Sequence, residues 1–193
     1  MKLVLASKSG VRKDILDKYG VVAIVTPSNV DEDQVKEALL EKGADPEIIS
    51  KNLAELKSIK VSTKYPDQLV LGADSVISLD LKLINKPNSR EEAYEILKLL
   101  NGKKHYLISS VCISKNGSMI WNYTDASSLT MKELNLDQIR SYLKKVDDKK
   151  LYAYGVYQIE AGGKDLFSKI EGDEDSIMGL PIKKIKEYLV NLK

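Results

Sequence analysis

The sequence predicts an α/β fold built around one central mixed β-sheet. Strand and helix signals alternate in the first part of the chain, which is typical of strands joined by helices. Long strand signals then pair across tight turns, which indicates antiparallel hairpins in the same sheet. No internal repeat, low-complexity tract or linker interrupts the 193 residues, so we expect a single domain over 1–193.

The first part of the chain alternates short apolar runs with polar segments. The apolar runs predict strands over 3–6, 21–26 and 69–73. The polar segments predict helices over 10–19, 31–42 and 46–65. Asp45 is expected to cap the third helix, with Pro46 at its first position. The continuous apolar run 69–73 is typical of a strand that is buried on both faces.

The rest of the chain is dominated by hairpin signals. We expect strands over 76–79, 82–84, 106–115, 119–131, 154–160 and 166–170, and helices over 137–145 and 181–192. Asn116-Gly117 is the strongest hairpin signal of the chain. Ser89-Arg90-Glu91-Glu92 predicts a capping box that opens a helix ending at Leu100.

The composition limits the class of protein. The 30 basic and 28 acidic residues nearly cancel, which argues against a nucleic-acid-binding protein and requires any anion site to be local. One cysteine, Cys112, and one histidine, His105, exclude an intrachain disulfide and the usual zinc clusters. We expect Cys112 to be buried in a strand and His105 to have a structural or surface role. The start lacks a signal-peptide core and no apolar stretch has the length of a membrane span, so we expect a cytoplasmic protein without a membrane partner.

The opening segment suits an anion. A short apolar strand runs into Ser7, Ser9 and Gly10, and a helix then starts with Arg12 and Lys13 in its first turn. Unpaired N–H groups and the positive end of the helix dipole favour phosphate there. Basic residues in a first turn disfavour the helix itself, so a negative group is expected nearby. A plain strand-to-helix connection is the alternative.

Two carboxylates also stand at informative places. Asp74 is expected at the end of the most hydrophobic strand, where open α/β sheets place their ligand crevices. Its alternative role is to cap a turn. Glu32 lies where a loop enters a helix, and its alternative role is to complement the helix dipole.

Short motifs follow one another in order along the chain. They are the opening 3–13, Val30-Asp31-Glu32, 53–57, 70–75, Asn85-Lys86-Pro87, 100–105, 156–160, Glu171-Gly172-Asp173 and Gly179-Leu180-Pro181. In this order and spacing, from Leu3 to Leu189, the set resembles the Maf family of nucleoside triphosphate pyrophosphatases, which belongs to the wider inosine triphosphate pyrophosphatase-like group. The resemblance implies an elongated two-lobed unit with a mixed sheet flanked by helices. It also implies hydrolysis of a nucleoside triphosphate to the monophosphate and pyrophosphate, and a homodimer.

The resemblance implies roles for ten residues. Asp74 would accept the proton of the attacking water, and Glu32 and Asp74 would hold a divalent cation, Mg²⁺ or Mn²⁺. Lys57 and Lys86 would act as catalytic cations on the triphosphate. The implied substrate-binding residues are Ser7, Ser9, Val11, Arg12, Ser75 and Glu160. No Walker loop is present in the sequence, which disfavours kinase or GTPase chemistry.

The resemblance implies that three positions help to select the nucleotide base, and here they are Val11, Ser75 and Glu160. In the family, the branch that cleaves thymidine and uridine triphosphates typically has arginine, threonine and glutamine there. A sister branch that cleaves 7-methylguanosine triphosphate has a hydrophobic residue first and glutamate last, as here. Glutamate can accept from the N1–H and N2–H₂ donors of guanine. The residues favour 7-methylguanosine triphosphate and a house-cleaning role against modified nucleotides. An ordinary exposed carboxylate is the alternative for Glu160.

A second hypothesis is a nucleotide-binding regulator of cell division or septum formation with little turnover. The altered motifs favour it, since the family usually has Ser-Pro-Arg-Arg for Ser9-Gly10-Val11-Arg12 and Gly-Lys-Pro for Asn85-Lys86-Pro87. The intact Asp74, Glu32, Lys57 and Lys86 argue against it. A nucleic-acid-binding module ranks third, since the charge is balanced and aromatic residues make up only 6% of the chain.

Overall fold

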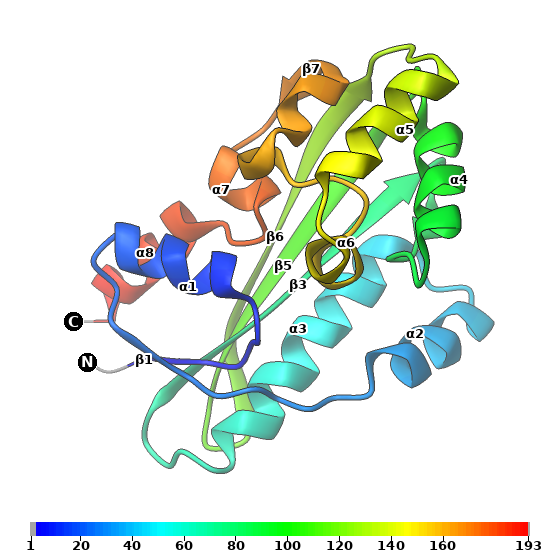
Figure 1. The fold of residues 1–193 in the computed structure, drawn as a ribbon. Helices are drawn as coiled ribbons and strands as arrows, with labels where there is room; N and C mark the ends of the chain where they lie inside the picture. The colour runs from blue at the N-terminus through cyan, green and yellow to red at the C-terminus, as the bar shows by residue number, and fades with distance from the viewer. Residues whose placement is uncertain (1–2, 193) are drawn as a thin grey trace.

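A seven-stranded mixed β-sheet runs through residues 3–192, which are the residues that the computed structural model describes (Figure 1). The strands are β1 (Leu3–Leu5), β2 (Ala23–Val25), β3 (Leu69–Leu79), β4 (Lys82–Ile84), β5 (Lys104–Lys115), β6 (Ser118–Met131) and β7 (Phe167–Glu171). Their order is β2-β1-β3-β5-β6-β7, with β4 paired to β3. Strand β1 is parallel to β2 and β3, and the other pairs are antiparallel. The predicted α/β class with a mixed sheet is confirmed.

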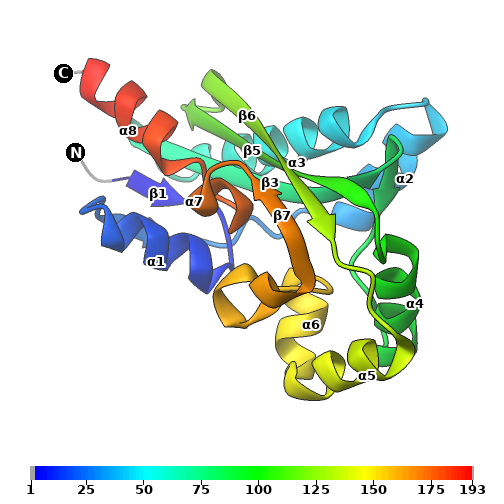
Figure 2. The ribbon, with the colours of Figure 1, turned by 90° about the horizontal axis from the view of Figure 1, so that it is seen from above.

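Helices cover both faces of this sheet. They are α1 (Gly10–Lys18), α2 (Glu32–Glu41), α3 (Pro46–Ser62), α4 (Arg90–Leu100), α5 (Leu136–Lys145), α6 (Asp148–Tyr154), α7 (Glu174–Ile177) and α8 (Ile182–Asn191). Helix α3 packs against β3 and β5. Figure 2 shows α3 on one side of the long strands and α1 and α7 on the other. None of the helices within 3–192 combines the length and apolarity needed to cross a bilayer.

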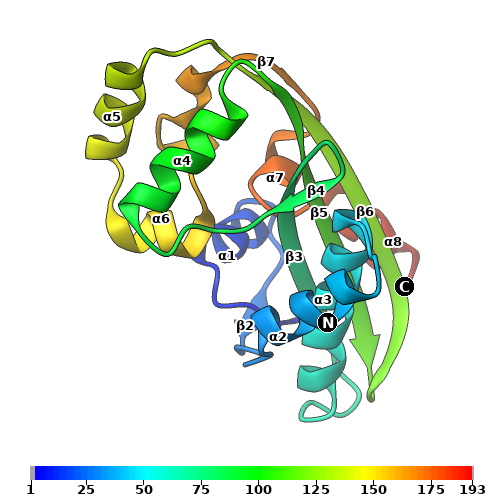
Figure 3. The ribbon, with the colours of Figure 1, turned by 90° about the vertical axis from the view of Figure 1, so that its right-hand side faces the viewer.

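Two hydrophobic cores lie toward opposite ends of the long strands. One core joins α1, α8 and β1 to the first half of β3, through residues such as Leu16, Ile185 and Leu71. The other joins α4 and α5 to the end of β6, through residues such as Leu97 and Leu129. Figure 3 shows α4, α5 and α6 gathered at one end, away from α8. This arrangement matches the two-lobed shape that the resemblance implies.

Strand β3 is longer than the sequence predicted, which corrects the expected place of Asp74. The structure has one strand over 69–79 that pairs with β5 from Val70 to Ser78, so Asp74 lies inside the strand and not at its end. The sequence suggested a break there because a charged and a polar residue follow a continuous apolar run. The long partner β5 keeps the ladder intact through this polar pair.

The segment 154–160 was wrongly predicted as a strand. Helix α6 ends at Tyr154, and a loop and a 3₁₀ turn, Ile159–Ala161, follow. Asp147 caps α6 by accepting from the backbone N–H groups of Lys149 and Lys150. Gly155, at a φ of 104°, ends the helix. The sequence prediction also missed α6 and the short α7.

Strand β3 and helix α3 approach each other closely at Gly72. A Cβ atom added to Gly72 would lie 2.1 Å from the carbonyl oxygen of Ala54 and 2.7 Å from the backbone nitrogen of Ser58. The backbone atoms of a helix cannot move away from a clash as the end of a flexible side chain can. Glycine is therefore required by space at this position.

We expect Gly72→Ala to lower the free energy of unfolding by about 3 kcal/mol, because the new methyl group must push α3 away from the sheet. Urea denaturation of both proteins measures the difference. Gly10→Ala is the matched control, since its added Cβ would meet only the Tyr154 hydroxyl at 3.9 Å. Equal stability of the two variants would contradict the close contact.

Candidate active site

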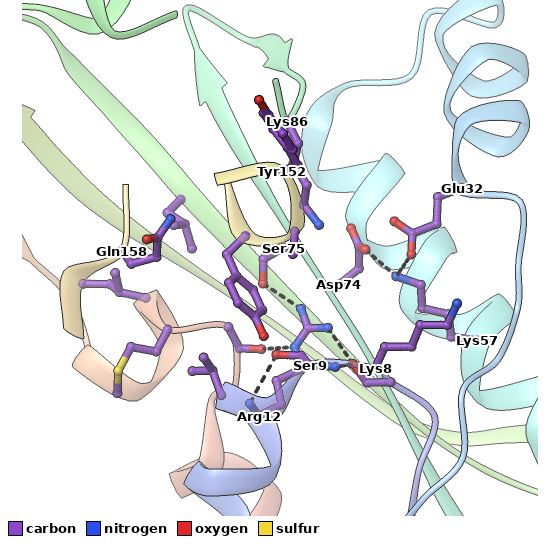
Figure 4. A pocket seen from close by; sticks show the side chains of 18 of the residues that line it. Lys8, Ser9, Arg12, Glu32, Lys57, Asp74, Ser75, Lys86, Tyr152 and Gln158 are labelled. Atoms are coloured by element: carbon purple, nitrogen blue, oxygen red, sulfur yellow. Dashed lines mark hydrogen bonds and ion pairs between the residues drawn. The ribbon is translucent and has the colours of Figure 1, made fainter. Parts of the chain in front are cut away.

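A cavity of about 410 Å³ opens beside β3 (Figure 4). All ten residues that the sequence analysis singled out line it: Ser7, Ser9, Val11, Arg12, Glu32, Lys57, Asp74, Ser75, Lys86 and Glu160. They come from segments spread over more than 150 positions of the chain. The structure thus brings the predicted residues together, and their individual roles remain predictions.

The cavity lies where β3 has no neighbouring strand on one side. Strand β1 pairs with β3 as far as Leu71, and the pairing of β3 with β4 starts at Ile77, so the edge of β3 is open between them. Successive side chains of a strand point to opposite faces. Asp74 therefore meets α3 and Ser75 meets α1, and both border the cavity across the open edge. The cavity therefore lies at this open edge of β3, whereas the sequence predicted a ligand crevice at the end of the strand.

Lys57 joins the two predicted metal-binding carboxylates. Its Nζ lies 2.7 Å from Asp74 Oδ1 and 2.8 Å from Glu32 Oε1 (Figure 4). Lys57 is buried on the inner face of α3, whereas Lys51 and Lys60 of the same helix are exposed. Burial by itself raises the pKa of Glu32. The charge and hydrogen bond of Lys57, together with the charges of Lys86 and Lys36, outweigh this effect and leave the pKa below its usual value. The sequence could identify Lys57 only through the resemblance.

Glu32 is positioned by the start of α2. Asp31 caps this helix by accepting from the backbone N–H of Gln34 at 3.1 Å, which places Glu32 at the first helical position. The Glu32 side chain is 37% exposed, whereas that of Asp74 is 7% exposed. One carboxylate is thus fixed in the protein interior, and the other faces it from the edge of the cavity.

The donor set fits a divalent cation that arrives with phosphate. Asp74 Oδ2 is buried and has no hydrogen-bond partner among the described residues, so it has a lone pair available to a ligand. Within 3–192, no group of three or more His, Cys, Asp and Glu side chains is placed to hold a metal ion. Mg²⁺ in proteins is usually held by one or two carboxylates, with phosphates and waters completing its shell. Glu32 and Asp74 match that pattern.

Arg12 holds three segments of the cavity wall together. Its Nε donates to Gly179 O at 2.9 Å, and its Nη1 donates to Ala73 O at 3.0 Å, on the open edge of β3. Its two other bonds go to Ser7 Oγ and Ser75 Oγ at 3.2 and 3.1 Å. Burial lowers the pKa of Arg12, while Asp74 and Glu32 oppose this effect. These bonds fix Arg12 on the cavity wall, and its predicted contact with the substrate stays a prediction.

The start of α1 is organised by the two serines. Ser9 caps the helix by accepting from the backbone N–H of Arg12 at 3.3 Å. Ser7 Oγ accepts from the backbone N–H of Ser9 at 3.2 Å. These bonds present the first turn of α1 to the cavity, where an anion is favoured.

Two further lysines face the cavity. Lys86 extends from the loop after β4, which is anchored by the buried Pro87. Desolvation by surrounding protein lowers the pKa of Lys86, and the charge of Glu32 opposes this effect. Lys8 is exposed on the cavity wall and was missed by the sequence analysis. Its position between Ser7 and Ser9 was the available signal.

The opposite part of the wall is aromatic and apolar. It includes Tyr152, Tyr154, Tyr157, Ile159 and Met178, together with the polar Gln158. No site role was predicted for any of them, although three lie in the motif 156–160. Those within 154–160 were missed because this segment was predicted to be a strand, and Tyr152 and Met178 lie outside the motifs. Glu160 is exposed and belongs to the 3₁₀ turn, so the expected late strand is corrected at this residue. Val11 is half-buried on the same cavity.

His105 supports this wall from behind. It is fully buried, and its Nε2 lies 2.9 Å from the hydroxyl of Tyr157. Phe167 packs edge-on against Tyr157, with ring centroids 4.9 Å apart. Burial lowers the pKa of His105 to about 4.

We expect His105→Gln to reduce the acid sensitivity of the fold. The pKa is about 4 in the folded protein and 6.5 ordinarily, so between these values mainly the unfolded chain takes up this proton. Stability is therefore lost as the pH falls from 6.5 toward 4, by about 2 kcal/mol at pH ~4.5. Urea unfolding at pH ~7 and ~4.5 measures this loss in both proteins. An equal loss in the variant would show that His105 does not contribute.

Comparisons of the sequence with known proteins identify its family. A family model described as "Maf-like protein" matches residues 2–192. A Pelagibacter ubique protein named nucleoside triphosphate pyrophosphatase is 65% identical over 192 residues, covering 100% of this chain and 98% of that protein. A Brucella abortus protein named 7-methyl-GTP pyrophosphatase is 38% identical over 182 residues, covering 94% and 92%. The solved Staphylococcus aureus Ham1 protein aligns with a TM-score of 0.43 and 14% identity, covering 68% of this chain and 72% of that one.

Proposed function

This chain belongs to the Maf family and acts as a nucleoside triphosphate pyrophosphatase, and we propose that it uses a divalent cation and prefers 7-methylguanosine triphosphate to thymidine or uridine triphosphate. The observation that carries the proposal is the Lys57 ammonium between two carboxylates, beside a buried and unpartnered Asp74 Oδ2. One region of the cavity is rich in charge and another is aromatic, as a nucleotide requires.

The charged region suits attack of water on the α-phosphorus. Asp74 Oδ2, which has no hydrogen-bond partner among the described residues, accepts the proton of the water. Lys57 and Lys86 stabilise the negative charge that develops on the phosphate oxygens as pyrophosphate leaves. A divalent cation bound by Glu32 and Asp74 would neutralise charge on the triphosphate and polarise a phosphoryl oxygen.

The aromatic region suits the base and ribose. Tyr154 and Met178 provide apolar surface on the cavity wall, and Val11 adds to it where an arginine would add charge. Glu160 is a carboxylate on the same wall that can accept from the adjacent N1–H and N2–H₂ of guanine. These residues support a guanine-type base. The Brucella abortus relative named 7-methyl-GTP pyrophosphatase is consistent with this preference.

We expect Asp74→Asn to lower kcat by about 100-fold or more, because the amide cannot accept the proton of the water. Pyrophosphate release from a panel of nucleotides with Mg²⁺ or Mn²⁺ measures the effect. Asp137→Asn, at the 94% exposed Asp137 side chain on α5, is the control and should act like the wild type. Turnover by Asp74→Asn within a few-fold of the wild type would remove Asp74 from the mechanism. Absence of release by the wild type above this variant would favour the regulator without turnover.

We expect Glu160→Gln to lower kcat/KM for 7-methylguanosine triphosphate by about ten-fold, because one guanine N–H loses a good acceptor. Cleavage of uridine triphosphate should stay unchanged or improve. Steady-state kinetics with both nucleotides test this, with Glu174→Gln at an exposed position outside the cavity as the control. A wild-type preference for uridine triphosphate that the substitution leaves unaltered would contradict the base assignment and leave the catalytic one intact.

A further inference from the structure

We infer that Lys57 is an internal counter-ion, whose ammonium occupies the position between Glu32 and Asp74 and prevents a free divalent cation from binding there. The ammonium leaves this position when the cation arrives bound to the nucleotide. The inference deepens the proposed function and rests on it for the identity of the incoming pair. It makes Lys57 the residue that sets the order of binding, in addition to its contact with phosphate.

The geometry puts the ammonium where a cation would otherwise bridge the carboxylates. Lys57 Nζ contacts one oxygen of each acid, at 2.7 and 2.8 Å, and its side chain is 7% exposed. An ammonium has three N–H donors, so these two contacts leave one donor for a further acceptor such as a phosphate oxygen. Lys57 can therefore change partners without leaving the site.

The charges around this contact oppose a free cation. Glu32 and Asp74 are faced by Lys57, Lys86 and Arg12, and the pKa of Lys86 responds to all four of these neighbours. Positive groups therefore outnumber negative ones in this cluster. A bare Mg²⁺ or Mn²⁺ meets net repulsion there, whereas the same ion carried by a triphosphate arrives with negative charge. Electrostatics thus favour joint entry of cation and nucleotide.

The number of carboxylates also favours joint entry of the cation and the nucleotide. Two acidic side chains are too few to saturate Mg²⁺, and within 3–192 no third His, Cys, Asp or Glu is placed to join them. The triphosphate supplies the missing oxygen ligands. It also supplies acceptors for Lys57, so that the lysine exchanges carboxylate for phosphate in the same event.

Direct Mn²⁺ binding to the nucleotide-free protein tests this inference. Isothermal titration and the paramagnetic resonance of free Mn²⁺ measure the affinity without any turnover. We expect Lys57→Met to bind Mn²⁺ at least about ten-fold more tightly than the wild type, because removing the ammonium leaves both carboxylates to the cation. Lys51→Met, exposed on the same helix, is the matched control and should leave the affinity unchanged.

Two further variants make the result specific. Lys57→Gln keeps hydrogen-bond donors for the carboxylates without the charge, and it should show the same gain even if Lys57→Met fails to fold. Adding Glu32→Gln to either variant should abolish the gain. Unchanged or weaker Mn²⁺ binding in folded Lys57→Met or Lys57→Gln would overturn the inference. Absence of pyrophosphate release by the wild type would instead count against the proposed function. The Mn²⁺ affinities would not be affected by that outcome, because they are measured without turnover.

Discussion

The close contact between α3 and β3 at Gly72 sets the geometry of the whole site. Alternation along β3 places Gly72 and Asp74 on the same face, toward α3. On the helix, Lys57 lies one turn beyond Ala54, whose carbonyl meets Gly72. A residue with a side chain at 72 would separate the two elements. The ion pair between Lys57 and Asp74 therefore depends on the absence of a Cβ atom at Gly72, two residues before Asp74.

The second determinant is the gap in the sheet. A carboxylate in the middle of an eleven-residue strand would normally have a neighbouring strand on each side. Between its pairs with β1 and β4, however, β3 has no neighbouring strand on one side. The two faces of the sheet meet at this opening, so Asp74 and Ser75 serve the same cavity from opposite directions. Arg12 closes the edge by binding the carbonyl of Ala73.

The sequence predicted those parts of the protein that local chemistry determines. Capping residues such as Asp45 and apolar runs such as 69–73 located most helices and strands. The resemblance located the residues that the structure gathers in the cavity. The continuity of β3 through Asp74 depends on pairing with β5, which is a distant part of the chain. Part of the aromatic wall was missed because aromatic and β-branched residues give 154–160 the composition of a strand, and tertiary packing overrides this preference. The same packing left Arg12 bound to protein groups, which motif reasoning does not foresee.

The bond from Arg12 to Gly179 has a consequence for the timing of assembly. The two residues are 167 positions apart, and Ser109 makes a similar bond to the carbonyl of Ser176 at 2.7 Å. During synthesis on the ribosome, the carboxylates and lysines emerge long before the turn that fixes Arg12 in place. A nascent or prematurely terminated chain therefore has the charged groups but lacks the completed wall. The part of the cavity wall that Arg12 joins to Gly179 can form only after the segment containing Gly179 has been made.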